Sequence, residues 1–294
     1  MADIKRNALD DGPGIRSTVF FKGCPLRCVW CHNPECIHAA AELMHRAERC
    51  IDCGTCRKVC PRGAIPEGGA AGMDRKQCDL CGECVDECPA GAIETVGRRY
   101  EVEELLAVLM RDEPFWRNSG GGVTLSGGEP MLYSEYAGTL ARRLRERGVH
   151  VMIETSGDFD WDAFDQHMRS HLDLVWVDVK LLDPGDHERH CGRDNRRILD
   201  NVARLAALGE PEMLIRVPLI PGITATEENL SGIAAFVSGL GLRRIGVIPY
   251  NPLWHGKARG LGRSPGLDRT EWMTREERER CRRALGDLEI VGDL

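Results

Sequence analysis

The sequence predicts an α/β fold in which six parallel strands form an open, TIM-like partial barrel, (β/α)6. Short apolar runs rich in β-branched residues recur along the chain, and segments with helical apolar spacing separate them. Strands that alternate with helices are joined by right-handed crossovers, which makes the strands parallel. The six units found here are fewer than the eight of a closed barrel, so the barrel should stay open.

The predicted strands are defined by the apolar runs at 17–21, 123–125, 149–153, 174–179, 213–217 and 244–248. Apolar side chains recur at helical spacing in the intervening segments 102–109, 199–205 and 230–237. In such folds the functional loops follow the carboxyl ends of the strands. We therefore look for a site in the residues that follow each run.

Composition excludes several classes of function. The 39 Lys and Arg residues are outnumbered by 46 Asp and Glu residues, and a formal net charge of -7 does not favour a nucleic-acid partner. The longest apolar runs are far shorter than the ~20 residues that span a bilayer, and we expect no membrane association. The N-terminus lacks the pattern of a secretory signal, so a cytoplasmic location is expected.

Cysteine is the unusual residue of this chain, which contains 14 of them. Eleven fall into three short clusters with gaps of two or three residues. Disulfide frameworks are expected in short secreted chains, whereas closely spaced thiolates are typical of metal centres. The spacing therefore favours iron–sulfur clusters over disulfides.

The α/β pattern breaks between residues 49 and 95, which we interpret as a small domain inserted into a larger one formed by 1–48 and 96–294. The passages Cys50–Ile65 and Cys78–Ile93 share the form C-x2-C-x2-C-x3-C-P-x-G-A-I and constitute an internal repeat. Each passage is too short to bury a core of its own. Bound metal would take the place of that core.

Both passages resemble the cysteine run of bacterial ferredoxins, in which the fourth cysteine ligates the cluster of the other run. The resemblance implies two [4Fe–4S] clusters in the insert, held by two sets of four thiolates. One set is Cys50, Cys53, Cys56 and Cys88, and the other is Cys60, Cys78, Cys81 and Cys84. A pair of zinc sites is the alternative, because tetrahedral zinc also favours C-x2-C.

A different motif precedes the insert, since Cys24-x3-Cys28-x2-Cys31 supplies three thiolates for a cluster that has four irons. The fourth iron would remain open and could chelate the amino and carboxylate groups of a substrate. The alternative is that His32 or Cys36 supplies the fourth ligand.

The flanks of this motif extend from Asp11 to Glu35 and read Asp-Gly-Pro-Gly-Ile-Arg, then Gly-Cys-Pro-Leu-Arg-Cys-Val-Trp-Cys-His-Asn-Pro-Glu. With them the sequence resembles the radical S-adenosylmethionine (SAM) enzymes and, among these, the activating enzymes of glycyl radical enzymes. The resemblance covers nearly the whole chain. It implies a third [4Fe–4S] cluster on the cysteine triad, and SAM cleavage to a 5′-deoxyadenosyl radical. That radical would abstract the Cα hydrogen of a glycine in the partner, with a ferredoxin or flavodoxin as reductant.

The same resemblance implies roles for residues at the strand ends. Gly127, Gly128 and Glu129 would contact the methionine amino group of SAM, although they also suit an ordinary strand-to-helix turn. Trp30 would lie against the adenine or simply pack in the core.

Two further strands end in polar residues, Glu154-Thr155-Ser156 and Asp178-Val179-Lys180. By resemblance Lys180 pairs with the methionine carboxylate, and Glu154, Ser156 and Asp178 belong to the same pocket. In some family members the two acids and the Thr carbonyl hold a monovalent cation beside the methionine carboxylate. Here Glu154 replaces an Asp, which could alter that site. Arg216 is a weaker pocket candidate, for which simple pairing with a carboxylate is the alternative. An ion pair at the strand end is the alternative for Asp178 and Lys180.

One departure concerns the last strand, where many family members read Pro-Tyr-His and this chain has Asn251. Asn can form hydrogen bonds but cannot become a cation near neutral pH. The family's fine specificity therefore does not carry over to this chain from the resemblance, whereas the radical chemistry does. Cys191 is interpreted as a small core residue, and Cys281 has no expected role. Two other functions stay open: a free-standing radical SAM enzyme that acts on a small molecule, and a plain electron-transfer ferredoxin.

Overall fold

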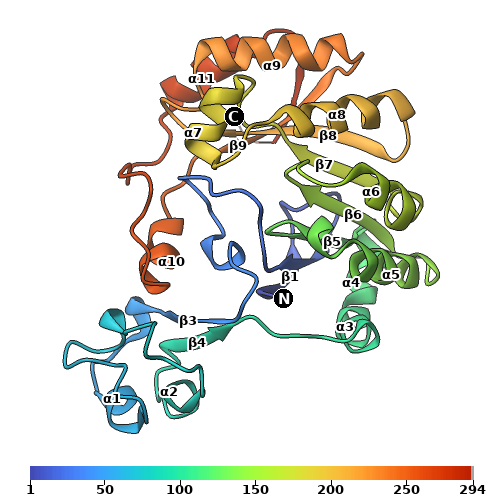
Figure 1. Cartoon of the computed structure of the whole chain (residues 1–294). Helices are drawn as coiled ribbons and strands as arrows, with labels where there is room; N and C mark the ends of the chain where they lie inside the picture. Colours follow the sequence, from blue (N-terminus) through green and yellow to red (C-terminus); the bar gives the residue numbers. More distant parts are fainter. Residues whose placement is uncertain (293–294) are drawn as a thin grey trace.

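An eight-stranded sheet forms the larger part of the computed structural model, which describes residues 1–292 (Figure 1). Its strands are β1 (Asp3–Ala8), β2 (Arg16–Phe21), β5 (Gly122–Gly127), β6 (His150–Thr155), β7 (Leu174–Asp178), β8 (Glu212–Leu219), β9 (Arg244–Pro249) and β10 (Glu289–Val291). They are arranged in chain order, and every neighbouring pair is parallel except β1 and β2. Since β1 and β10 are the two ends of this sheet, the barrel is open between them.

The predicted α/β fold with six parallel strands is confirmed, and the two edge strands are additions that the sequence analysis missed. Strand β1 reads DIKRNA and is mostly exposed, so it carries no apolar period. Backbone pairing holds it to β2, with Asp3 opposite Phe20. Strand β10 has only three residues, which is too short for a recognisable pattern.

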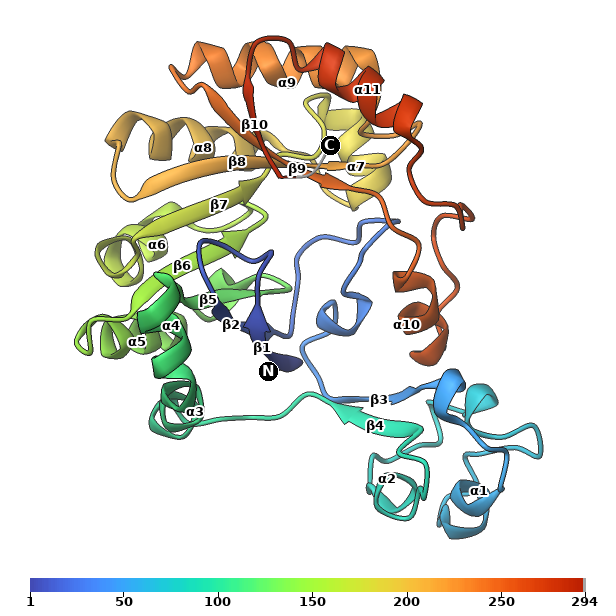
Figure 2. The ribbon, with the colours of Figure 1, turned by 180° about the vertical axis from the view of Figure 1, so that it is seen from behind.

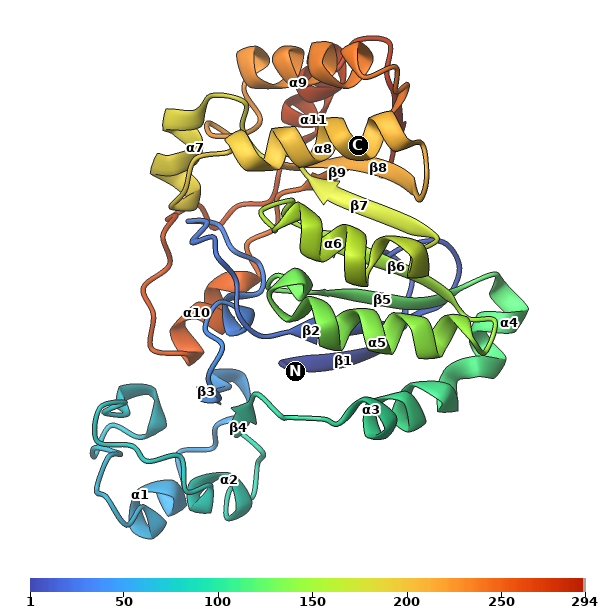
Figure 3. The same cartoon turned by 45° about the vertical axis from the view of Figure 1, so that its right-hand side comes forward.

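Helices cover the outer face of the sheet, as the views in Figures 2 and 3 show. They are α3 (Val102–Leu109), α4 (Glu113–Ser119), α5 (Ser134–Arg145), α6 (Trp161–His167), α7 (Pro184–Cys191), α8 (Arg196–Leu208), α9 (Glu227–Gly239) and α11 (Arg275–Ala284). The main core lies between sheet and helices, where Leu105, Leu140 and Val202 are fully buried. Each crossover helix buries one face against the sheet, as its helical apolar spacing predicted.

The cysteine-rich insert forms a separate lobe at one end of the molecule (Figure 1). It contains α1 (Thr55–Val59) and α2 (Glu83–Asp86), framed by the antiparallel pair β3 (Glu42–His45) and β4 (Ile93–Val96). Its own apolar cluster is small and includes Leu43, Ile65 and Ile93. We propose that residues 49–95, carried on this strand pair, are a distinct structural domain.

The lobe is tied to the barrel through α10 (Trp254–Gly260), which follows the last long strand. Arg75 of the lobe donates hydrogen bonds to the carbonyls of Leu43, at 2.7 Å, and of Gly260, at 2.8 Å. Among the helices within residues 1–292, none is both long enough and apolar enough to cross a membrane.

Candidate active site

The loop after β2 carries the cysteine triad, and backbone hydrogen bonds fix it on two sides. Its amides at Gly23 and Cys24 donate to the carbonyls of Cys36, at 2.8 Å, and Ile37, at 3.0 Å. On the other side Arg27 N donates to the carbonyl of Cys191 at the end of α7, at 2.7 Å. The loop is therefore held between the segment that follows it and the far side of the barrel.

All three triad thiols line one cavity of about 330 Å³ at the carboxyl ends of the parallel strands. This is the edge of the sheet where α/β barrels carry their active sites. The predicted residues that share the lining are Cys24, Cys28, Trp30, Cys31, Gly127, Gly128, Glu154, Ser156, Asp178, Lys180 and Arg216. His32 and Thr155, which the sequence analysis considered respectively as a possible cluster ligand and as a cation ligand through its carbonyl, also line it. Residues that the sequence analysis did not assign to the pocket complete the lining: Asp10, Asp11, Leu26, Asn33, Ser126, Pro218 and Ile248.

The donor set of the cavity fits an iron–sulfur cluster. Burial raises the pKa of Cys24 and of Cys31 to about 12, so both are thiols near neutral pH. A metal that binds there must displace the proton of each thiol, which is released to solvent. Of the two alternative fourth ligands, His32 lines the cavity, and burial lowers the pKa of its imidazole to about 4. Cys36 is buried outside the lining.

The two glycines at the end of β5, Gly127 and Gly128, are needed for close packing against the cysteine loop. A Cβ on Gly128 would collide with the backbone carbonyls of Gly23 and Cys36. Gly127 has a φ of +107° and lies against the backbone of Phe21, so a side chain there would be strained and blocked. The Gly-Gly pair thus brings the end of β5 against the loop that carries the triad.

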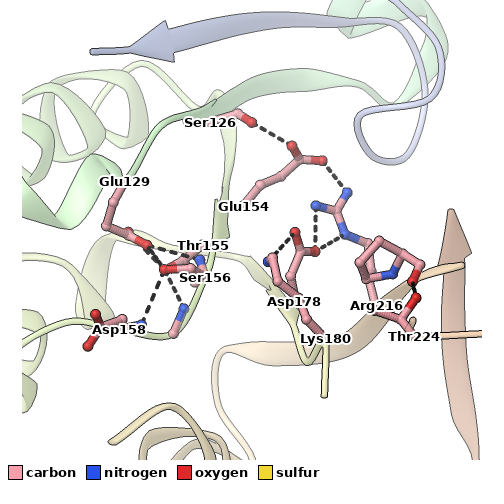
Figure 4. Close-up of polar contacts among 12 residues, drawn as sticks. Ser126, Glu129, Glu154, Thr155, Ser156, Asp158, Asp178, Lys180, Arg216 and Thr224 are labelled. Carbon is pink, nitrogen blue, oxygen red and sulfur yellow. Dashed lines mark hydrogen bonds and ion pairs between the residues drawn. The ribbon is translucent and has the colours of Figure 1, made fainter. Parts of the chain in front are cut away.

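Four charged side chains meet beside the triad, one each from β6 and β8 and two from β7 and the residues after it (Figure 4). Arg216 Nη1 donates to Glu154 Oε1 at 2.5 Å, and Arg216 Nε donates to Asp178 Oδ1 at 3.0 Å. Lys180 Nζ lies 3.3 Å from Asp178 Oδ2. Arg216 therefore bridges two carboxylates from neighbouring strands.

Burial and charge act in opposite directions on these groups. Burial would raise the pKa of Asp178, but the charges of Arg216 and Lys180 outweigh it and the pKa is lowered. Burial would lower the pKa of Lys180, but the Asp178 carboxylate reverses the shift. Burial raises the pKa of Glu154, and the charge of Arg216 limits the rise. Asp178 and Lys180 thus form a charged pair that faces the cavity.

Glu129 lies outside the cavity lining, contrary to its predicted place beside SAM. Its buried carboxylate accepts hydrogen bonds from Thr155 Oγ1 at 2.9 Å, Ser156 N at 2.9 Å and Ser156 Oγ at 2.6 Å (Figure 4). It also accepts one from Met131 N at 3.2 Å. The side chain turns toward the end of β6 because three donors lie there, and it fixes two pocket-forming loops to each other.

Asn251 also lies outside the lining. Its side-chain oxygen accepts a hydrogen bond from Leu253 N at 3.3 Å, within the turn that leads to α10. The neighbouring Tyr250 is fully buried and donates to the carbonyl of Arg269 at 2.5 Å. The departure from the Pro-Tyr-His pattern therefore falls in a structural turn.

The sequence analysis considered a place in the cofactor pocket and packing in the core as alternatives for Trp30, and the structure shows features of both. It lines the cavity, and it is only 3 % exposed within an apolar cluster. That cluster includes Cys191, Tyr250 and Trp254. Cys191 is a buried core residue, as its interpretation expected.

Lys257 on α10 is a residue whose role the sequence analysis missed. Its ammonium donates to the carbonyl of His32 at 3.2 Å, to Asn33 Oδ1 at 3.0 Å and to Glu35 Oε1 at 2.6 Å. It thereby anchors the segment directly after the triad. Only the fold reveals this contact, because the partners are far apart in the chain and no motif surrounds Lys257.

The insert arranges its eight cysteines in two sets of four. Cys50, Cys53, Cys56 and Cys88 line a pocket of about 250 Å³, and Cys60, Cys78, Cys81 and Cys84 line a second pocket. Each set combines three thiols of one repeat with the fourth of the other, which is the ferredoxin arrangement. Within residues 1–292, no three His, Cys, Asp or Glu side chains lie as close as the ligands of a single metal ion.

Two family profiles match the chain. The profile described as the radical SAM superfamily matches residues 76–231, and the profile described as a 4Fe-4S dicluster domain matches residues 49–93. The first spans more than half of the chain, and the second coincides with the cysteine-rich insert.

Named relatives are similar over most of their length. The trans-4-hydroxy-L-proline dehydratase activating enzyme of Clostridioides difficile is 39% identical over 253 residues, which are 85% of this chain and 83% of the relative. The benzylsuccinate synthase activating enzyme of Thauera aromatica is 41% identical over 288 residues, 92% of this chain and 85% of the relative.

Among solved structures, SuiB of Streptococcus suis bound to the precursor peptide SuiA superposes with a TM-score of 0.57 at 11% identity. The match covers 94% of this chain and 48% of the SuiB chain. At this identity the likeness concerns the fold alone.

Proposed function

Because this chain belongs to the radical SAM superfamily and, within it, to the activating enzymes of glycyl radical enzymes, we propose that Cys24, Cys28 and Cys31 hold its reactive [4Fe–4S] cluster. A cluster held there would supply the electron that cleaves SAM into methionine and a 5′-deoxyadenosyl radical. The observation that carries the assignment is the cavity itself, in which the three thiols face charged strand ends. The product radical would take the Cα hydrogen of a glycine in the partner enzyme.

The other lining residues would bind and orient SAM. Lys180 keeps its proton and would pair with the methionine carboxylate, because a charged ammonium binds a carboxylate strongly. Gly127 and Gly128 leave backbone exposed where the methionine amino group would lie. Trp30, held by the apolar cluster behind it, would form a water-excluding wall for the adenosine.

We infer two auxiliary [4Fe–4S] clusters in the insert, which makes three in all. The support is the pair of pockets lined by four thiols each. These clusters would pass electrons from a ferredoxin or flavodoxin toward the triad. None of the 14 cysteines, all within the part of the chain that the structure describes, forms a disulfide, which suits a reducing compartment, and we propose that the protein works in the cytoplasm.

A monovalent cation is not part of the proposed site. The carboxylate oxygens that would bind it already accept hydrogen bonds from Arg216, Lys180 and Ser126.

The test is an anaerobic incubation of the reduced enzyme with SAM and a candidate glycyl radical enzyme, read by electron paramagnetic resonance. We expect a stable organic radical on the partner, which is lost when the partner's glycine is replaced by alanine. Cleavage of SAM without a radical on any partner, together with hydrogen transfer from a small molecule, would instead establish the free-standing enzyme. The activating-enzyme relatives favour the first outcome.

A further inference from the structure

The two acids expected to bind a monovalent cation already accept a hydrogen bond at every carboxylate oxygen. Glu154 Oε1 accepts from Arg216 Nη1 at 2.5 Å, and Glu154 Oε2 accepts from Ser126 Oγ at 2.6 Å (Figure 4). Asp178 Oδ1 accepts from Arg216 Nε at 3.0 Å, and Asp178 Oδ2 from Lys180 Nζ at 3.3 Å. Each of the four carboxylate oxygens thus has a donor, and the guanidinium occupies the space between the two acids.

Sheet register places this guanidinium. Glu154 lies opposite Trp176, and Asp178 lies opposite Arg216, on neighbouring parallel strands. The Arg216 guanidinium carbon lies 4.9 Å from the centroid of the Trp176 ring, a distance at which a cation and an aromatic face attract each other. Two carboxylates and one ring therefore hold the side chain, which is 11% exposed.

Within this cluster of four side chains the charges balance without a metal ion. Glu154 and Asp178 contribute two negative charges, and Arg216 and Lys180 contribute two positive ones. Asp10 and Asp11 line the same cavity outside the cluster, and Asp11 pairs with Lys5. Before SAM binds, an added cation would be a third positive charge beside two carboxylates in a buried site, where an unpaired charge is costly. The cation would also have to displace the guanidinium. In the proposed complex the methionine carboxylate is paired by Lys180.

We propose that Arg216 takes the place of the monovalent cation, so that the SAM site of this chain needs no bound metal ion. The inference rests on the proposed function and names a positioning role for Arg216. Glu154 makes the substitution possible, because its carboxylate extends one carbon–carbon bond, about 1.5 Å, farther than that of an Asp. That extra length lets Glu154 reach the guanidinium across the strand pair.

Lys180 remains free to serve the cofactor. Its contact with Asp178 is the longest of the set, and its ammonium has three N–H donors. It can therefore donate to the methionine carboxylate of SAM while it still donates to Asp178. Arg216 thus neutralises the two acids, and Lys180 is left for the substrate.

The direct test measures cation binding and not activity. Full-length, cluster-reconstituted protein is dialysed anaerobically against radioactive rubidium, a potassium mimic, with and without SAM. We expect no stoichiometric rubidium in either case. In a separate assay, replacement of potassium by tetramethylammonium should leave the rate of SAM cleavage unchanged. One rubidium bound per chain, or a rate that requires potassium, would overturn the proposal.

Two variants extend the test. In Arg216→Gln the guanidinium is lost, and we expect rubidium binding together with SAM cleavage that is reduced about tenfold and partly restored by potassium. Glu154→Asp should show the same gain of rubidium binding with a smaller loss of rate, and it keeps Arg216 to support folding. If Arg216→Gln and Glu154→Asp both fold and neither binds rubidium, the proposal that Arg216 replaces the cation is contradicted.

Arg244→Gln is the matched control, because Arg244 is half exposed and pairs with Glu212 and Glu289 away from the cavity. It should behave as the wild type in every assay. The proposed function and the role of Arg216 can fail separately. A wild-type protein that cleaves no SAM in any salt would refute the proposed function. The rubidium measurement does not depend on cleavage and would still decide whether Arg216 replaces the cation.

Discussion

The barrel and the insert both present cysteines with two-residue gaps, yet they surround them differently. The triad has three thiols, and they open into a cavity lined by charged strand ends. The insert has two sets of four thiols, and it leaves Cys53 and Cys81 exposed to solvent. A complete set of ligands suits electron transfer, whereas a missing ligand beside a binding pocket suits chemistry. The comparison teaches that ligand number and surroundings separate the two roles, and that spacing alone does not.

The largest contrast should come from removing one ligand in each region. We expect Cys84→Ala to lose one insert cluster and the reduction by flavodoxin that depends on it, while SAM cleavage driven by dithionite persists. The triad would still be intact and directly accessible to the chemical reductant. Iron analysis and both assays on the same preparation check this. Loss of dithionite-driven cleavage would show that the insert is part of the reactive site.

Glu129→Ala should cause the largest loss of stability outside the clusters. The change leaves the buried hydroxyls of Thr155 and Ser156 and the Ser156 amide without their acceptor. We expect a loss of roughly 3 kcal/mol in the free energy of unfolding. Denaturant unfolding measures it, and Glu113→Ala, which removes an exposed i,i+4 pair with Arg117, should change little. Equal effects of the two changes would refute the structural role of Glu129.

Lys180→Met should weaken SAM binding and leave the clusters intact. Loss of a charged hydrogen bond to the methionine carboxylate corresponds to an affinity roughly 10–100-fold lower. Equilibrium dialysis with the oxidised holoenzyme gives the dissociation constant. Lys58→Met, on the exposed surface of the insert, is the control. An unchanged affinity in Lys180→Met would place the carboxylate elsewhere.

A smaller difference is expected in how strongly protons compete with iron in the two regions. Burial raises the pKa of Cys24 and Cys31 to about 12, whereas in the insert burial raises that of Cys84 to about 11 and the hydroxyl of Thr55 lowers that of Cys53. Protons compete with iron below a thiol's pKa, so at a given pH between about 7 and about 9 the triad should bind iron more weakly than the insert. Iron content of separate triad and insert knockouts at each pH measures this. Weaker iron binding in the insert than in the triad would contradict it.

Much of this architecture was predictable because its signals are local in the sequence. Apolar runs mark the parallel strands, and parallel strands bring Glu154, Asp178 and Lys180 to one edge of the sheet. The edge strands β1 and β10 were missed, since one is polar and exposed and the other is very short.

Side-chain direction was less predictable than strand position. Glu129 follows the Gly-Gly pair, but its orientation depends on donors in the next strand's loop. Asn251 is turned by its own local hydrogen bond. Lys257 reaches the cysteine loop only through the packing of α10, which no pattern in the sequence encodes.

The most direct test of the central claim follows 5′-deoxyadenosine by chromatography after anaerobic reconstitution, dithionite reduction and addition of SAM. The account predicts production by the wild type and by Cys281→Ala, whose buried thiol belongs to none of the three sets, and none by Cys28→Ala with its insert clusters intact. Production by Cys28→Ala, or none by a wild type that carries all three clusters, would contradict the assignment of the triad as the reactive centre.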